Sequence, residues 1–367
     1  MEPVDELSAF LPGALDRLHA EVGQDRSFAA SLAWQRILSE GNWVAPSWPV
    51  EFGGRSLSPT ERIPIDEALA ASGAPQIAGT LGVKNVGPTL LVYGTTEQKQ
   101  HLARILSTEE LWCQGFSEPD AGSDLASMKT RAERDGEEFV INGEKVWTTN
   151  GLRATHCELL VRTDPSAPKH KGISALLVPL DLPGIERRPI HQLTGGTDFA
   201  AMSFTDVRVP VSALLGPLNE GWKVTTTTLA HERSGIAMFA VRSEHEIVEY
   251  VLRQAGAALA PSLRHELVDR YMEARINGWM GRNILATLLA GGEPTPEQSV
   301  IKLAWSTTGQ RFGQTRLNVA GLDAIAGLAP DDTFAFLQSR SSTIAAGTTE
   351  VMKNILAERV LGLPREP

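Results

Sequence analysis

The chain has 367 residues, of which 42% are hydrophobic and 21% are charged, a composition typical of a soluble globular protein with one large or two to three smaller domains. The net charge of −10 argues against nucleic acid or an anionic membrane as the main partner. No apolar run approaches about twenty residues, and the acidic start lacks a secretory pattern. Two cysteines, Cys113 and Cys157, imply no disulfide framework. We therefore expect a cytoplasmic protein with no membrane span.

Apolar residues recur at helical spacing in the first part of the chain, up to about residue 111. Helical periodicity returns after residue 216, with long runs at 222–254, 262–289, 296–320 and 349–361. Such runs pack naturally as a bundle. The pattern contains neither a βαβ alternation nor a GxGxxG or GxxxxGK[ST] loop. Histidines occur singly and without the spacing of metal ligands, so no metal site is expected.

The middle of the chain has the character of a β domain. Residues 139–141 and 145–147 flank Asn142-Gly143, which predicts a hairpin with a two-residue turn. Further short strands are expected at 158–161, 173–178 and 202–209. We therefore predict an α+β multidomain fold with an N-terminal helical domain (1–111), a middle β domain (112–215) and a C-terminal helical bundle (216–367).

Two polar stretches of this middle region are candidates for a ligand site. Residues 112–124 read WCQGFSEPDAGSD, a turn that offers backbone N–H groups and small hydroxyls. Residues 147–151 read WTTNG and add a flat apolar face and another hydroxyl. Together they could hold a planar ring with hydrogen-bonding edges; the alternative is two surface turns with a core tryptophan. Neither stretch contains a plausible proton acceptor, because Glu118 is better explained as support for the turn.

These residues resemble the acyl-CoA dehydrogenase family of flavoproteins. The resemblance rests on PVEFGG at 49–54, FSEPDAGSD at 116–124, ING at 141–143 with WTTNG at 147–151, and AGTTE at 346–350 with AERVLGLP at 357–364. It implies a helical N-terminal domain, a middle β-barrel, a C-terminal four-helix bundle, and FAD between the β domain and the bundle. It also implies an acyl-CoA substrate and an electron-transferring flavoprotein as acceptor.

The resemblance assigns roles to particular residues. Phe116 and Ser117 contact the isoalloxazine ring, Trp147 lies beside it, and Thr149 hydrogen-bonds its edge. Ser123 lies near the thioester or pantetheine arm. Asn318 stands where many members have a glutamine that faces the adenosine part of FAD. The hydroxyls and aromatic faces suit these roles, since they tune the ring and exclude water.

The reaction needs a carboxylate that removes the proton alpha to the thioester. Many family members carry it in a loop near the C-terminus, where this chain has Ala346, which keeps only a backbone N–H for the thioester oxygen. The isovaleryl-CoA dehydrogenase-like branch places the base on an early bundle helix, and Glu232 matches that position, followed by Arg233 to orient the CoA arm. The alternative is a surface pair of Glu232 with Arg233 or His231. Glu350 is expected to be structural.

The chain also departs from the family. The usual R-x-x-F-G segment, whose arginine reaches the FAD pyrophosphate of a neighbouring subunit, is not intact at 251–258, and Arg253 is an uncertain substitute. Three hypotheses therefore stand: an FAD-dependent acyl-CoA dehydrogenase with Glu232 as base, a non-catalytic or FAD-sharing partner subunit of a heteromeric dehydrogenase, and an oxygen-using relative. We expect a homo-oligomer (dimer or tetramer) or a heteromer with a related chain, acting on fatty or steroid side-chain acyl groups.

Overall fold

The computed structural model describes residues 2–23, 25, 27–290 and 299–364; the side chains of residues 59, 230–236, 288 and 289 lie outside the described part. The chain separates into two compact units, each with a buried core of its own. The first unit contains Met1–His191 and Thr197–His231. The second contains Gln192–Gly196 and Glu232–Pro367.

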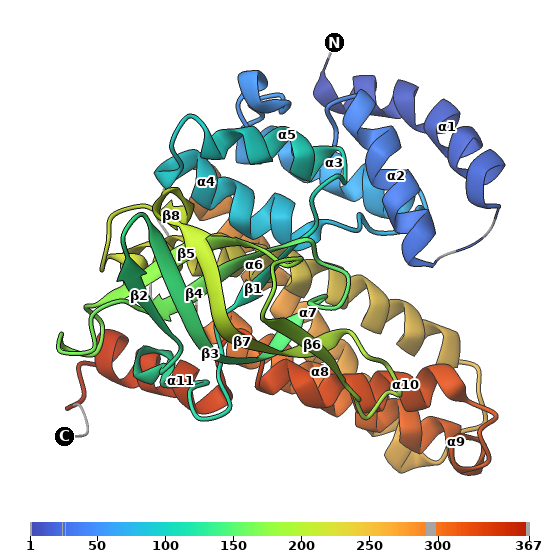
Figure 1. The fold of residues 1–367 in the computed structure, drawn as a ribbon. Coiled ribbons are helices and arrows are strands. Elements are labelled where there is room, and N and C mark those ends of the chain that lie inside the picture. Colours follow the sequence, from blue (N-terminus) through green and yellow to red (C-terminus); the bar gives the residue numbers. More distant parts are fainter. Residues whose placement is uncertain (1, 24, 26, 291–298, 365–367) are drawn as a thin grey trace. The chain divides into compact units, whose positions relative to one another are not determined.

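Helices form the first part of the first unit, as the sequence predicts. They are α1 (Pro3–Val22), α2 (Phe28–Glu40), α3 (Pro59–Ala71), α4 (Gly87–Tyr93) and α5 (His101–Leu106), with 3-10 turns η1 (Val50–Phe52) and η3 (Gln98–Gln100). A π-helical turn, η2 (Gly82–Val86), runs directly into α4. Figure 1 shows α1 beside α2 and α3 in blue, and the three helices bury a common apolar core that includes Leu7, Leu38 and Trp43.

Local sequence fixes where two of these helices begin. Ser27 caps α2, because its side-chain oxygen accepts the N–H of Ala29. A capping box starts α3: the Ser58 hydroxyl accepts the N–H of Glu61, and the Glu61 carboxylate accepts the N–H of Ser58.

The middle β domain, also predicted, is an eight-stranded sheet with the order β6-β7-β3-β2-β4-β5-β8 and β1 paired to β4. The strands are β1 (Trp112–Gly115), β2 (Arg131–Asp135), β3 (Glu138–Thr149), β4 (His156–Arg162), β5 (Ile173–Pro179), β6 (Ile185–Ile190), β7 (Phe199–Pro210) and β8 (Leu214–Leu215). Short 3-10 turns occur at η4 (Leu125–Ser127) and η5 (Val211–Ala213). The strands predicted at 158–161, 173–178 and 202–209 are therefore confirmed as β4, β5 and β7.

The hairpin predicted at Asn142-Gly143 is wrong. Residues 138–149 form one continuous strand, β3, which pairs with β2 on one side and β7 on the other. The register against β7 shifts between Ile141 and Gly143, so the Asn-Gly pair makes a bulge inside the strand. The side chain of Asn142 exchanges two hydrogen bonds with Asp206, Nδ2 to Oδ1 at 3.0 Å and Oδ1 from the backbone N at 2.9 Å. The amide thus ties the bulge to the neighbouring strand instead of closing a turn.

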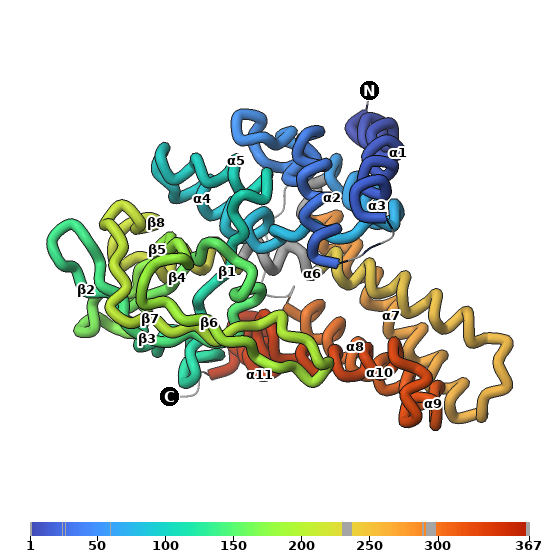
Figure 2. Tube along the Cα trace, turned by 45° about the vertical axis from the view of Figure 1, so that its right-hand side comes forward, coloured from blue at the N-terminus to red at the C-terminus, as the bar shows by residue number. Residues whose placement is uncertain are grey.

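The second unit is helical. α6 (Gly221–Gln254) enters it, followed by α7 (Pro261–Leu289), α8 (Ser299–Ala320), α9 (Leu322–Ile325), α10 (Pro330–Ser339), the 3-10 turn η7 (Arg340–Thr343), α11 (Thr349–Ile355) and the π-helical turn η8 (Leu356–Val360). Both views show α8 alongside α7 and α10 (Figures 1 and 2). The helical C-terminal domain completes the predicted fold class.

An aromatic and ionic core holds the bundle together. Tyr250 and Phe312 pack edge to face, with ring centroids 5.3 Å apart, and the Arg316 guanidinium lies over the Tyr250 ring. The buried carboxylate of Glu244 on α6 pairs with Arg275 and Arg282 on α7 at 2.8 and 2.6 Å. Among the described residues no helix is long and apolar enough to cross a membrane.

Candidate functional site

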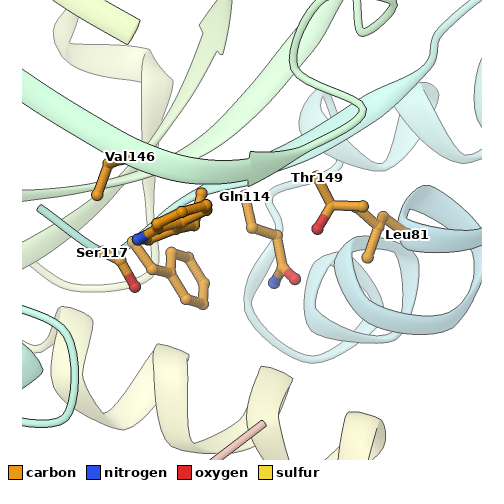
Figure 3. Close-up of a pocket in the computed structure, with 7 residues that line it drawn as sticks. Leu81, Gln114, Ser117, Val146 and Thr149 are labelled. Carbon is orange, nitrogen blue, oxygen red and sulfur yellow. The ribbon is translucent and has the colours of Figure 1, made fainter. Parts of the chain in front are cut away.

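A pocket of about 130 Å³ opens in the first unit where the two predicted polar stretches meet. Its lining comes from strands β1 and β3, the turn after β1, and the residue before η2 (Figure 3): Leu81, Gln114, Phe116, Ser117, Val146, Trp147 and Thr149. The four residues expected to contact a flavin ring, Phe116, Ser117, Trp147 and Thr149, thus share one pocket. Of the other three, Gln114 lies inside the predicted stretch 112–124 but was given no role there, and Leu81 and Val146 were not predicted.

The turn after β1 is anchored by a buried ion pair. Lys145 on β3, whose side chain is fully buried, donates from Nζ to Glu118 Oε1 at 2.9 Å and to the carbonyl of Phe116 at 3.0 Å. Glu118 also accepts the backbone N–H groups of Lys129 and Thr130. Burial acts to raise the pKa of Glu118, but Lys145 and these donors outweigh it and hold the pKa below its ordinary value. Glu118 therefore supports the turn.

A second bulge in β3 presents Trp147 to the pocket. The register against β7 shifts between Lys145 and Thr148, and Trp147 takes a left-handed backbone with φ of 59°. The Val146 N–H leaves the ladder and donates to the Ser117 carbonyl at 2.9 Å, which joins the two stretches. As a result Trp147 is 59% exposed, whereas Phe139 on the same strand is buried. Strain and exposure together at a pocket are typical of a ligand-binding position.

The donor set of the pocket fits a planar aromatic ring with polar edges. Trp147 and Phe116 supply ring faces, and Ser117, Thr149 and Gln114 supply two hydroxyls and a carboxamide. Figure 3 shows Gln114 between Ser117 on one side and Thr149 and Leu81 on the other. Groups of these kinds can hold a planar ring by stacking and by hydrogen bonds to its edge.

The remaining predicted site residues lie elsewhere. Ser123 is exposed on the turn after β1 and does not line the pocket. Asn318 on α8 belongs to the second unit, where its side chain accepts from Gln314 and donates to Glu266, each at 3.0 Å. Ala346, also in the second unit, is exposed and has a left-handed backbone with φ of 55°.

Glu232 and Arg233 fall within the range of α6, but their side chains lie outside the described residues. Their assignment as base and orienting arginine therefore stays a prediction. Arg253, the uncertain substitute for the R-x-x-F-G arginine, is described: it pairs with Glu249 one turn earlier on α6 at 2.7 Å.

Three groups with metal-ligand chemistry meet away from the pocket. Nδ1 of His101 lies 2.7 Å from a carboxylate oxygen of Glu110, and Nε2 of His156 lies 3.8 Å from the other. Arg104 also hydrogen-bonds this carboxylate, and Trp112 donates to it at 3.1 Å. Burial acts to raise the pKa of Glu110, yet these neighbours hold it below its ordinary value. The Arg104 guanidinium already occupies this carboxylate, and the contacts of the cluster tie α5 to β1 and β4.

Comparison with known proteins agrees with this architecture. The descriptions "Acyl-CoA dehydrogenase, N-terminal domain", "middle domain" and "C-terminal domain" match residues 3–110, 113–207 and 219–361. Acyl-CoA dehydrogenase IpdE1 of Mycobacterium tuberculosis is 37% identical over 388 residues, covering 100% of this chain and 99% of that protein. The structure titled "Tcur3481-Tcur3483 steroid ACAD" is 31% identical with a TM-score of 0.84, covering 100% of this chain and 99% of that chain. The ChsE4-ChsE5 complex of M. tuberculosis is 29% identical with a TM-score of 0.79, covering 99% and 97%.

The chain therefore belongs to the acyl-CoA dehydrogenase family. It is an oxidoreductase of the acyl-CoA dehydrogenase type.

Proposed function

We propose that this chain catalyses FAD-dependent α,β-dehydrogenation of an acyl-CoA thioester. The observation that carries the proposal is the strained, exposed Trp147 beside the hydroxyls of Ser117 and Thr149 in one pocket. When bound there, FAD supplies the acceptor for the hydride that leaves the β-carbon. Ser117 and Thr149 hydrogen-bond the ring edge, while Trp147 and Phe116 shield its face from water. Asn318 contacts the adenosine part of the cofactor.

Glu232 removes the α-proton in this proposal. The family loop that commonly carries the base holds Ala346 here, so a carboxylate has to come from another element. By helical spacing in the sequence, Glu232 shares a face with Leu229, Ile236 and Phe239, and an apolar site makes a carboxylate a stronger base. Arg233 orients the CoA arm, Ser123 lies near the thioester or pantetheine arm, and the backbone N–H of Ala346 donates to the thioester oxygen.

A second candidate function is that of a partner subunit that shares FAD with a related chain. Two sequence features favour it: the alanine at position 346 and the missing R-x-x-F-G segment at 251–258. Two relatives are described by titles that pair two chains, the Tcur3481-Tcur3483 steroid ACAD and the ChsE4-ChsE5 complex. The first title also names a steroid, which favours ring-bearing acyl groups among the substrates to test.

An electron-transferring flavoprotein is the acceptor we propose.

Cofactor binding tests the pocket directly. We expect the purified chain to bind FAD and turn yellow, alone or with a related partner chain. Trp147→Ala should weaken FAD binding about fivefold, because a stacked ring contributes about 1 kcal/mol. Its thermal stability should change little, since the ring is largely exposed in the free chain. Trp147→Phe keeps an aromatic face and should restore most of the affinity. Equal FAD affinity in the alanine variant would exclude this pocket as the ring site.

A further inference from the structure

A closed ring of hydrogen bonds lies behind the pocket and includes a buried acid that the proposed reaction does not use. Asn85 Nδ2 donates to Gln114 Oε1 at 3.0 Å, and Gln114 Nε2 donates to Glu158 Oε2 at 3.2 Å. Oε1 of Glu158 lies 3.0 Å from the Thr228 hydroxyl, which lies 2.9 Å from the Thr89 hydroxyl. Thr89 closes the ring by donating to the Asn85 carbonyl at 2.8 Å.

The ring connects separate elements of the first unit. Asn85 is in η2, Thr89 in α4, Gln114 in β1, Glu158 in β4 and Thr228 near the start of α6. Gln114 and Glu158 are register partners in the parallel β1–β4 pair, so their side chains lie on the same face of the sheet. Gln114 also lines the pocket, and the ring therefore ends at the proposed flavin site.

The ring supplies Glu158 with two hydrogen-bond donors, the Gln114 carboxamide and the Thr228 hydroxyl, and both are neutral. The Thr89 hydroxyl lies within hydrogen-bond distance of the Asn85 carbonyl and of the Thr228 hydroxyl, and either hydroxyl can be the donor between the two. Thr228 has one proton but three acceptors in reach, the third being the Val224 carbonyl at 3.2 Å. The Glu158 carboxyl therefore competes with two other acceptors for the Thr228 proton, which leaves little support for a buried negative charge.

The surroundings of Glu158 favour the neutral form. Its side chain is fully buried, and among the described residues no cation forms an ion pair or hydrogen bond with it. Amide and hydroxyl groups reach the ring from η2, α4 and α6, and the titratable neighbours on β4 and β1 are the buried thiols of Cys157 and Cys113. Burial raises the pKa of Glu158 to about 7, although hydrogen bonds from Gln114 and Thr228 act to lower it.

We propose that Glu158 is a positioning residue: as a neutral acid it fixes the Gln114 carboxamide at the edge of the pocket, and its ionisation alters the environment of the bound flavin. With its nitrogen held by Glu158 and its oxygen held by Asn85, the carboxamide cannot flip. It keeps one N–H and one lone pair for the ring edge. Ionised Glu158 would place a negative charge one amide away from the pocket.

The test is a pH titration of oxidised bound flavin, followed by its absorbance between about pH 6 and pH 8, with free FAD titrated in parallel as the blank. The wild-type chain should show a one-proton spectral step centred near pH 7. Glu158→Gln, which is nearly isosteric but cannot ionise, should lose the step. Gln114→Leu should lose most of its amplitude. Glu133→Gln, which removes an exposed carboxylate on β2, should keep it unchanged.

A second variant secures the test if Glu158→Gln does not fold. Thr228→Val removes a hydrogen bond that lowers the pKa of Glu158, so the step should move to higher pH. The proposal rests on the flavin site proposed above, and the two fail differently. A chain that stays colourless with FAD and a partner chain overturns the flavin site and this proposal with it. A yellow chain with no step, or with the same step in Glu158→Gln, overturns the role of Glu158 alone.

Discussion

The buried pair of Lys145 and Glu118 should be the most sensitive ionic contact of the β domain. Lys145→Met removes the cation but leaves the Glu118 carboxylate 6% exposed, with only the backbone N–H groups of Lys129 and Thr130 as donors. Breaking a buried pair from one side costs about 3 to 5 kcal/mol, and the two remaining donors place this case near 3 kcal/mol. We expect that loss in the free energy of unfolding, measured by urea unfolding with tryptophan fluorescence.

Two further variants show whether the loss comes from the unpaired buried charge of Glu118. Lys129→Met removes an exposed pair with Asp120, in which both side chains are more than three-quarters exposed, and should cost about 0.5 kcal/mol or less. The double variant Glu118→Gln with Lys145→Met removes both charges and should recover part of the loss. If Lys145→Met costs less than about 1 kcal/mol, Glu118 is not held as a buried carboxylate and the explanation of the turn is wrong.

Two more perturbations test separate parts of the β domain. The pKa of Glu158 rises from 4.5 to about 7 on folding. Below pH 4.5 the carboxyl is protonated in both states, so it does not change the free energy of unfolding. Between pH 4.5 and pH 7 it ionises in the unfolded chain only, which stabilises the unfolded chain. Wild-type stability should thus fall by about 3 kcal/mol across this window relative to Glu158→Gln, measured as unfolding free energy against pH; parallel curves would contradict the burial argument. Gly143→Ala should cost about 2 kcal/mol or more in thermal unfolding, because φ is +150° and a Cβ would lie 2.6 Å from the Thr130 Cα. Gly136→Ala, with φ of +62° and open space, should cost about 1 kcal/mol, and equal losses would refute the steric explanation.

The sequence predicted what depends on local periodicity and missed what depends on partners across the sheet. The long helical runs and the strands 158–161 and 173–178 have strong apolar patterns, and they are α6–α8, β4 and β5. Strands β2 and β6 were not predicted, because they are polar and largely exposed. Backbone pairing of β2 with β3 and of β6 with β7 holds them in place. Asn142-Gly143 has the chemistry of a turn, but Asp206 and the close approach of Thr130 turn it into a bulge.

The candidate site shows the same division. Phe116, Ser117, Trp147 and Thr149 could be predicted because they sit in recognisable motifs, and they line one pocket. The role of Glu158 could not be predicted, because in the sequence it begins the strand-like run ELLV and carries no motif. Only the parallel pairing of β1 with β4 reveals that it lies opposite Gln114.

The base assignment is the central claim, and an anaerobic titration of the yellow protein with acyl-CoA tests it most directly. The panel should contain short, branched, long and steroid-type acyl-CoAs, so that failure with one class does not decide the outcome. Glu350→Gln is the matched control, since it removes an exposed carboxylate at the start of α11. We expect wild type and the control to bleach, while Glu232→Gln keeps its bound flavin and does not bleach. Unchanged bleaching in Glu232→Gln would contradict the account.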